Sequence, residues 1–169
     1  MKHTNSFLGF TLVELLAVII IISILSGLGV GYYKRSVEQS RFSEGLAAAS
    51  AVVEALNRTY FDEQLEGITP PDVHSFDTLD VEIGGKCTGG ACQKTNHFDV
   101  YITQDNQNQE VVRAYRGGAG GGGYYIEMYP NHTVGNKKDQ IACVGGGDDG
   151  IAFCQSMGYV HCDSGRCTK

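Results

Sequence analysis

A long apolar run near the N-terminus constrains this chain more than any other feature of its sequence. Residues 10–31 read FTLVELLAVIIIISILSGLGVG, and Glu14 is the only charged side chain among them. An α-helix of about 20 apolar residues can span a hydrocarbon core about 30 Å thick. The run therefore predicts a membrane-spanning helix, preceded by a short basic segment, residues 1–9.

Glu14 distinguishes this run from an ordinary membrane anchor. A carboxylate inside a membrane helix costs about 2.5–3.5 kcal/mol on insertion scales, so such residues usually have a partner and a function. A secretory signal peptide would have a shorter apolar region followed by a small-residue cleavage site. Here the only small-residue break precedes the run, at Gly9. An uncleaved anchor remains as an alternative, but it leaves Glu14 unexplained.

The apolar run continues into an amphipathic segment, residues 32–61. Apolar side chains recur there at spacings of 4, 3, 4, 3 and 4, which places them on one face of a helix. No proline occurs before Pro70, so we expect one helix from Phe10 to about Phe61. The apolar face consists of Phe42, Leu46, Ala49, Val53, Leu56 and Tyr60.

The rest of the chain predicts a small antiparallel sheet, so the expected fold class is α+β. Residues 62–97 are expected to connect the helix to the sheet, with a short strand at 78–83. Residues 98–169 should hold the sheet and a cysteine-rich, loop-rich C-terminal region. Alternating apolar residues and turn signals predict consecutive strands at 98–103, 110–116 and 124–129, with loops at 104–109 and 117–123.

The cysteines favour disulfides and an oxidising compartment. Their even number in a Gly-rich region is typical of a disulfide framework. Loose zinc-like spacings are the alternative, but a membrane anchor already predicts export. The short spacing suggests that Cys87 pairs with Cys92, and the pairing of the other four is left open. The six candidates are Cys87, Cys92, Cys143, Cys154, Cys162 and Cys167.

Charge and motifs exclude several classes of function. Against 13 Lys and Arg stand 19 Asp and Glu, a net charge of -6, which disfavours a general nucleic-acid surface because such a surface needs clustered positive charge. The sequence holds no nucleophile–base, phosphate-loop or dinucleotide motif, so we expect neither an enzyme nor a cofactor. We expect no metal site either. Asp148 and Asp149 lie in a Gly-rich stretch and fit a solvated turn better than calcium, which takes 6–8 oxygen ligands.

The start of the apolar run resembles a known motif. Residues 9–16, GFTLVELL, resemble the cleavage and methylation motif of type IV prepilins and pseudopilins. Gly9 stands before the cut, Phe10 after it, and Glu14 is the fifth residue of the mature chain. The detailed resemblance covers about the first 45 residues, and beyond them it is architectural. Many type IV pilins have proline at the position of Gly31, which leaves the subtype open.

The resemblance implies a maturation pathway and a filament. A prepilin peptidase would cut between Gly9 and Phe10 and methylate the new amine of Phe10. Glu14 would then neutralise the Phe10 amine of a neighbouring subunit, which sets the register of a helical homo-oligomer. The implied location is the inner membrane with a periplasmic head before assembly. Afterwards it is a cell-surface pilus or a periplasmic pseudopilus, built with pilus or secretion assembly machinery.

Three alternatives remain open at this point. A pseudopilin of a type II secretion system would share the N-terminal motif. A minor pilin that binds DNA or a surface would need a local basic patch, for which Arg113, Arg116, Lys137 and Lys138 are the candidates. A single-pass membrane protein that never polymerises would retain its Met1 start.

Overall fold

The computed structural model describes residues 11–86, 92–117, 123–133, 137 and 140–169. The chain divides into two compact units, Met1–Gln39 and Ser40–Lys169. Helix α1, Leu12–Glu66, contributes to both units. Each unit is described by itself.

The described part of the first unit, residues 11–39, begins with the apolar stretch of α1. Large apolar side chains from Leu12 to Val30 are exposed on all faces of the helix. Its most apolar stretch has a mean hydropathy of 2.6, long and apolar enough to cross a membrane. The Ser23 hydroxyl in this stretch donates to the carbonyl of Ile19 at 2.6 Å, so its polar group is satisfied within the helix. The helix stays regular through Gly27, Gly29 and Gly31.

In the second unit, residues 40–66 of α1 bury the predicted apolar face. Phe42, Ala49, Val53 and Leu56 are buried, together with Val52 on the same side. The predicted amphipathic helix is therefore confirmed. It ends at Glu66 rather than near Phe61.

Gly67 explains the later end of the helix. Its φ of 72° is left-handed, and its N–H donates to the Gln64 carbonyl at 3.3 Å. The N–H of Ile68 donates to the Glu63 carbonyl at 2.9 Å. This pair of bonds is a Schellman motif, which glycine accommodates without the strain of a Cβ atom. The prediction of an end at Phe61 overlooked this stop signal.

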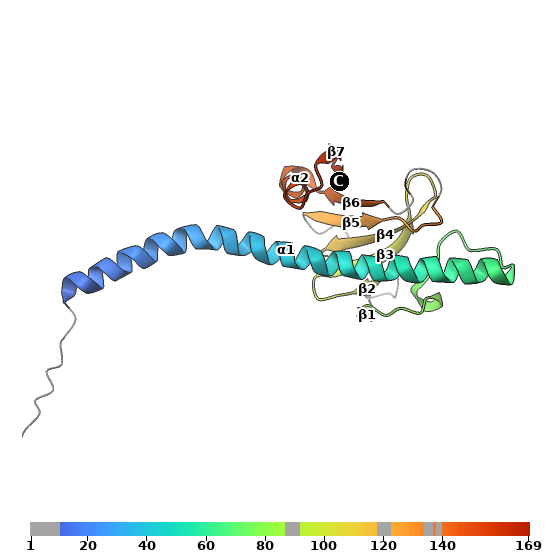
Figure 1. Cartoon of the computed structure of the whole chain (residues 1–169), viewed down its shortest axis with the longest axis horizontal. Coiled ribbons are helices and arrows are strands. Elements are labelled where there is room, and N and C mark those ends of the chain that lie inside the picture. Colours follow the sequence, from blue (N-terminus) through green and yellow to red (C-terminus); the bar gives the residue numbers. More distant parts are fainter. Residues whose placement is uncertain (1–10, 87–91, 118–122, 134–136, 138–139) are drawn as a thin grey trace, which may run out of the picture. The chain divides into compact units, whose positions relative to one another are not determined.

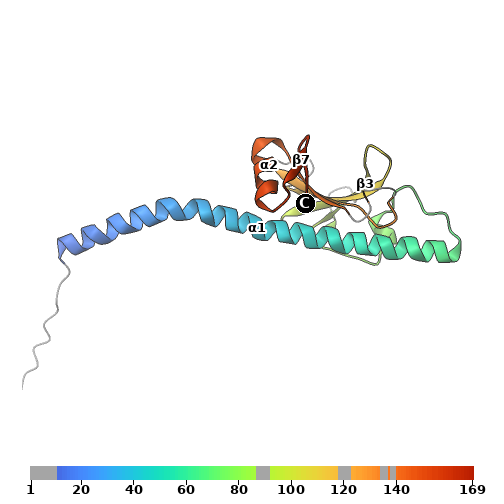
Figure 2. The ribbon, with the colours of Figure 1, turned by 45° about the horizontal axis from the view of Figure 1, so that its top comes forward.

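An eight-stranded antiparallel sheet carries the rest of the unit, in the order β1-β2-β3-β4-β5-β6-β8-β7. Figures 1 and 2 show residues 40–66 of α1 along one face of this sheet. The three predicted strands are confirmed as β3, β4 and β5. The strands are β1 Gly85–Lys86, β2 Gln93–Lys94, β3 Phe98–Gln104, β4 Glu110–Arg116, β5 Tyr124–Met128, β6 Ile141–Gly145, β7 His161–Asp163 and β8 Arg166–Thr168.

The predicted strand at 78–83 is wrong. A 3-10 turn, η1, occupies Phe76–Thr78, and the following residues are irregular. Leu79, Val81 and Ile83 pack against the core, so their alternation reflects burial on one side rather than strand pairing. The N–H of Ile83 donates to the side-chain oxygen of Gln93 at 2.8 Å.

The C-terminal region is more regular than expected. Helix α2, Gly147–Ser156, follows β6, and the hairpin of β7 and β8 closes the sheet edge. Asp148 and Asp149 lie in the first turn of α2 rather than in a solvated turn. Carboxylates at that position interact favourably with the positive end of the helix dipole, which contributes to the helical conformation of this Gly-rich stretch.

An aromatic cluster joins both helices to the sheet. Phe153 of α2 stacks on Tyr124 of β5 with ring centroids 4.4 Å apart. Phe42 of α1 contacts Tyr124, Phe153 and Tyr159 at 5.8–5.9 Å. Aromatic pairs at these separations stabilise beyond their buried area. The core thus lies between the sheet and the two helices.

Candidate functional site

The start of α1 forms a reciprocal capping arrangement. The backbone N–H and the hydroxyl of Thr11 both donate to Glu14 Oε2, each at 2.8 Å. The backbone N–H of Glu14 donates to Thr11 Oγ1 at 3.3 Å. The first helical bond follows, from Leu15 N to the Thr11 carbonyl at 3.2 Å. This is a capping box, in which two otherwise unpaired donors at the helix start are satisfied.

The capping box leaves half of the Glu14 carboxylate open. Both bonds from Thr11 end on Oε2, and Oε1 has no hydrogen bond within the part of the chain that the structure describes. Gly9 and Phe10, the predicted cleavage and methylation residues, lie outside the described residues. Glu14 therefore has one oxygen committed to its own helix and a second oxygen available to another donor.

Sequence reasoning assigned Glu14 a role but missed Thr11. The signal was present, because Thr or Ser followed three residues later by Glu is the signature of a capping box. The spacing from Thr11 to Glu14 fits that signature. The prediction treated Glu14 only as a charge for a neighbouring subunit.

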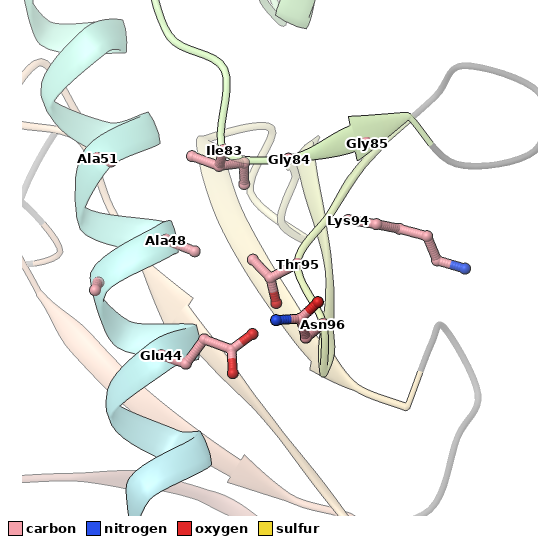
Figure 3. A pocket seen from close by; sticks show the side chains of 10 residues that line it. Glu44, Ala48, Ala51, Ile83, Gly84, Gly85, Lys94, Thr95 and Asn96 are labelled. Atoms are coloured by element: carbon pink, nitrogen blue, oxygen red, sulfur yellow. The ribbon is translucent and has the colours of Figure 1, made fainter.

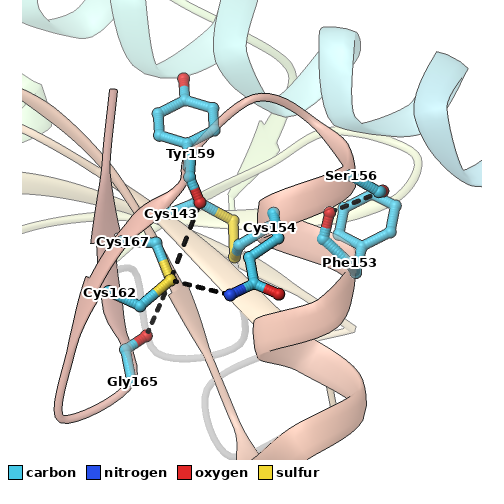
Figure 4. Close-up of a disulfide and its surroundings, with 9 residues drawn as sticks. Cys143, Phe153, Cys154, Ser156, Tyr159, Cys162, Gly165 and Cys167 are labelled. Carbon is cyan, nitrogen blue, oxygen red and sulfur yellow. Dashed lines mark hydrogen bonds between the residues drawn. A yellow bond between two sulfur atoms is a disulfide. The ribbon is translucent and has the colours of Figure 1, made fainter.

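Two disulfides hold the C-terminal region together (Figure 4). Cys143 of β6 is bonded to Cys154 of α2, with Cα atoms 5.6 Å apart. Cys162 and Cys167 join the neighbouring strands β7 and β8. Cys143 is also the register partner of Cys167, so the two bonds lie side by side at this sheet edge. They confirm the prediction of disulfides and decide the four cysteines left open.

The other predicted pair is only half described. Cys92 is buried and disulfide-bonded, while Cys87 lies outside the described residues. The pairing of Cys87 with Cys92 therefore stays a prediction.

A buried charge cluster connects the end of α1 to β4. Glu110 of β4 faces His74 Nδ1 at 3.0 Å and His132 Nε2 at 3.1 Å. His74 Nε2 faces Glu63 of α1 at 3.1 Å. Tyr60 stacks on His132 with centroids 4.2 Å apart. Sequence patterns could not predict this convergence, since its members are up to 72 positions apart, from 60 to 132.

The cluster changes the charge preferences of its members. Burial by itself lowers the pKa of His74, but the carboxylates of Glu63 and Glu110 outweigh burial and raise it. Burial raises the pKa of Glu110, but hydrogen bonds from His132 and the His74 backbone outweigh it and lower that pKa. Both shifts favour the charged forms, an imidazolium between two carboxylates.

Two of the candidate basic residues are paired with internal carboxylates. Arg113 donates to the buried carboxylate of Glu127 at 3.0 Å, and Lys137 is paired with Asp105. Arg116 donates to the His97 carbonyl at 3.4 Å. Lys138 lies outside the described residues. Internal carboxylates thus neutralise two of the four charges that a DNA-binding surface would use.

A surface hollow of about 670 Å³ lies between α1 and the β1–β2 hairpin (Figure 3). Three small side chains, Ala47, Ala48 and Ala51, leave this space on the helix side. At its rim a hydrogen bond of 2.6 Å joins Glu44 Oε2 and His97 Nδ1. Glu44 also accepts a hydrogen bond from the side chain of Thr95, which lines the same hollow.

No cluster of three metal-ligating side chains occurs among the residues that the structure describes. Asp148 and Asp149 are both exposed. The calcium reading of this stretch gains no support.

A long helix whose second part packs on an antiparallel sheet, with disulfides near the C-terminus, is a pilin-like α+β fold. The N-terminus agrees with this class, because the model of the prokaryotic N-terminal methylation motif matches residues 5–30. The motif is the hallmark of type IV pilin and pseudopilin prepilins, and it confirms the resemblance seen in residues 9–16. The motif and the apolar stretch of α1 are consistent with a membrane-anchored protein of this class. No curated protein and no solved structure matched the chain.

Proposed function

We propose that this chain is a prepilin that is cut between Gly9 and Phe10, methylated at the Phe10 amine, and polymerised into a type IV pilus. Glu14 Oε1 carries the proposal, because among the described residues it is a carboxylate oxygen without a hydrogen bond at the start of an apolar helix. A charge so placed needs a cationic partner when water is excluded. The amine of Phe10 on a neighbouring subunit would supply it.

The capping box gives the helix a defined start before assembly. Thr11 satisfies Glu14 Oε2 inside the single chain, so the carboxylate is partly compensated while the subunit waits in the membrane. Pairing with a neighbour would complete it. Because only a correctly placed neighbour can reach Oε1, the pair selects the register of the helices rather than supplying much net stability.

The pilus assignment rests on membrane insertion and homo-oligomerisation through the apolar part of α1. All its apolar faces are exposed in the single chain, which suits lipid first and neighbouring helices afterwards. Prepilin peptidase and a pilus assembly machine are the partners that this pathway requires. The match to the methylation motif equally supports a pseudopilin, whose filament would stay in the periplasm and serve secretion.

Intact-mass analysis of the protein isolated from its membrane tests the first step. We expect a chain that begins at Phe10 and carries one added methyl group. Glu14→Ala should leave that mass pattern unchanged, apart from the mass of the substitution itself. No filaments should be recovered when cells that carry this variant are sheared. A mature protein that retains Met1, or normal filaments from Glu14→Ala, would contradict the proposal. If a strain that lacks this chain keeps its pili but loses protein secretion, the chain would be a pseudopilin instead.

A further inference from the structure

Three exposed apolar side chains cluster where α1 ends. Phe61, Leu65 and Ile68 are 62%, 71% and 51% exposed. Phe61 and Leu65 are one helical turn apart, and the Schellman motif at Gly67 returns Ile68 towards the helix end. We call these three residues the distal patch. Large apolar side chains grouped in this way on a head surface indicate a contact site.

Exposed acidic groups flank the distal patch. Asp62 and Glu66 follow Phe61 and Leu65 by one position and are exposed. Neither forms an ion pair within the described residues. Glu63, by contrast, turns inward to His74. The distal patch therefore presents apolar side chains with negative charge along one side.

The first unit carries a surface of complementary character. Tyr32 and Tyr33 are highly exposed, and they are followed directly by the exposed Lys34 and Arg35. Neither base has an ionic partner in the portion of the chain described here. We call these four residues the neck. Aromatic rings beside basic side chains match an apolar patch beside carboxylates, in apolar character and in sign of charge.

We propose that the distal patch of one copy binds the neck of a second copy of this chain. The two surfaces are 28 positions apart in the sequence, from Tyr33 to Phe61. Apolar burial supplies the attraction, and the pairs of Asp62 and Glu66 with Lys34 and Arg35 set orientation. The inference rests on the proposed function, since it needs a filament that brings copies together.

This contact is distinct from the pairing of Glu14 with Phe10. That pairing offsets two copies by 4 positions, from 10 to 14. The distal contact offsets them by about 28 positions, from 33 to 61. One pair of copies cannot satisfy both offsets, so each subunit uses two different neighbours. The neck suits a membrane interface before assembly. In the filament it would instead be covered by the distal patch of another copy.

Charge exchange in the full-length chain tests the contact in cells that assemble filaments. Lys34→Glu with Arg35→Glu should reduce sheared filaments at least tenfold, and so should Asp62→Lys with Glu66→Lys. The combined fourfold variant should recover to within about threefold of the unaltered chain. A fourfold variant as poor as its parents would overturn the proposal. Leu65→Ser should lower the yield, whereas Val160→Ser, at a side chain 58% exposed elsewhere on the head, should not.

Photo-crosslinking identifies the occupant directly. A benzoylphenylalanine in place of Leu65 should crosslink in filaments to a peptide of a second copy that contains Tyr32 or Tyr33. The same group in place of Val160 should not reach that peptide. Crosslinks to lipid, to another protein or to another segment overturn the contact while leaving the filament intact. If the unaltered chain forms no filaments and keeps Met1, the proposed function fails and this contact fails with it.

Discussion

The Glu110 carboxylate accepts the backbone N–H of His74 at 2.7 Å and also faces the ring Nδ1 of the same residue at 3.0 Å. The second ring nitrogen of His74 faces Glu63. A neutral imidazole has only one N–H, so His74 can donate to both carboxylates only as an imidazolium. A protonated histidine thus fastens the end of α1 to β4 in the interior of the head.

The stability of the head should fall as pH rises above about 6.5. The pKa of His74 is raised above its ordinary 6.5, so its contribution is complete below that value and is lost as pH passes the folded-state pKa. Denaturant unfolding of the full chain in detergent, followed by near-UV circular dichroism, would measure this. His74→Gln should remove the alkaline slope. His161→Gln, at an exposed residue of β7, should retain it, and a slope unchanged in His74→Gln would refute the assignment.

Asp105 should protect the head against acid. Its side chain is 5% exposed and paired with Lys137. It accepts the Tyr129 hydroxyl and the N–H groups of Gln107 and Gln109 at 2.8–3.0 Å. Burial opposes ionisation, but these donors outweigh it and lower the pKa of Asp105 to about 2.

This shift amounts to about 2 kcal/mol, present above pH 3.8 and lost as pH falls towards 2. Asp105→Asn should therefore unfold more easily at pH 6 by about 2 kcal/mol, with less loss at pH 3. Asp163→Asn, an exposed carboxylate of β7, serves as the control. Equal losses in Asp105→Asn at both pH values would show that the carboxylate charge contributes nothing.

The two described disulfides should differ in their contribution. Cys143 and Cys154 close a loop of sequence separation 11, whereas Cys162 and Cys167 close one of 5. Chain entropy predicts about 3 kcal/mol for the longer loop and about 2 kcal/mol for the shorter. Paired Cys→Ser variants, compared by denaturant midpoint, should follow that order. The first pair should lose more than entropy alone predicts, because both of its sulfur atoms belong to fully buried residues.

Two substitutions separate the two functions of the Glu14 carboxylate. Glu14→Gln keeps an oxygen that can accept the N–H of Thr11 but removes the charge, so filaments should disappear. Thr11→Val removes the capping hydroxyl, worth about 1 kcal/mol, and keeps the charge, so filaments should persist at a several-fold lower yield. Electron microscopy of sheared fractions would count them. Equal loss in both variants would mean that capping, rather than charge, governs assembly.

Periodicity was enough to predict most of the regular elements. The alternation of Phe98 and Val100 and the helical spacing of Phe42 and Leu56 each report one buried face, and the structure confirms both elements. The same reasoning failed at Val81, where alternating side chains are buried without a strand partner. It also failed at Asp148, where a Gly-rich stretch begins helix α2, which a disulfide joins to β6.

The sequence by itself determined the long apolar helix, the methylation motif and the charge at Glu14, because each is a local pattern of neighbouring residues. Only the tertiary structure decided the pairing of Cys143 with Cys154, the convergence of His74 and His132 on Glu110, and the exposure of the distal patch. These depend on which distant segments meet when the strands pair. A short sequence pattern predicts whether a side chain is buried or exposed. The register of the sheet decides which distant residue contacts it.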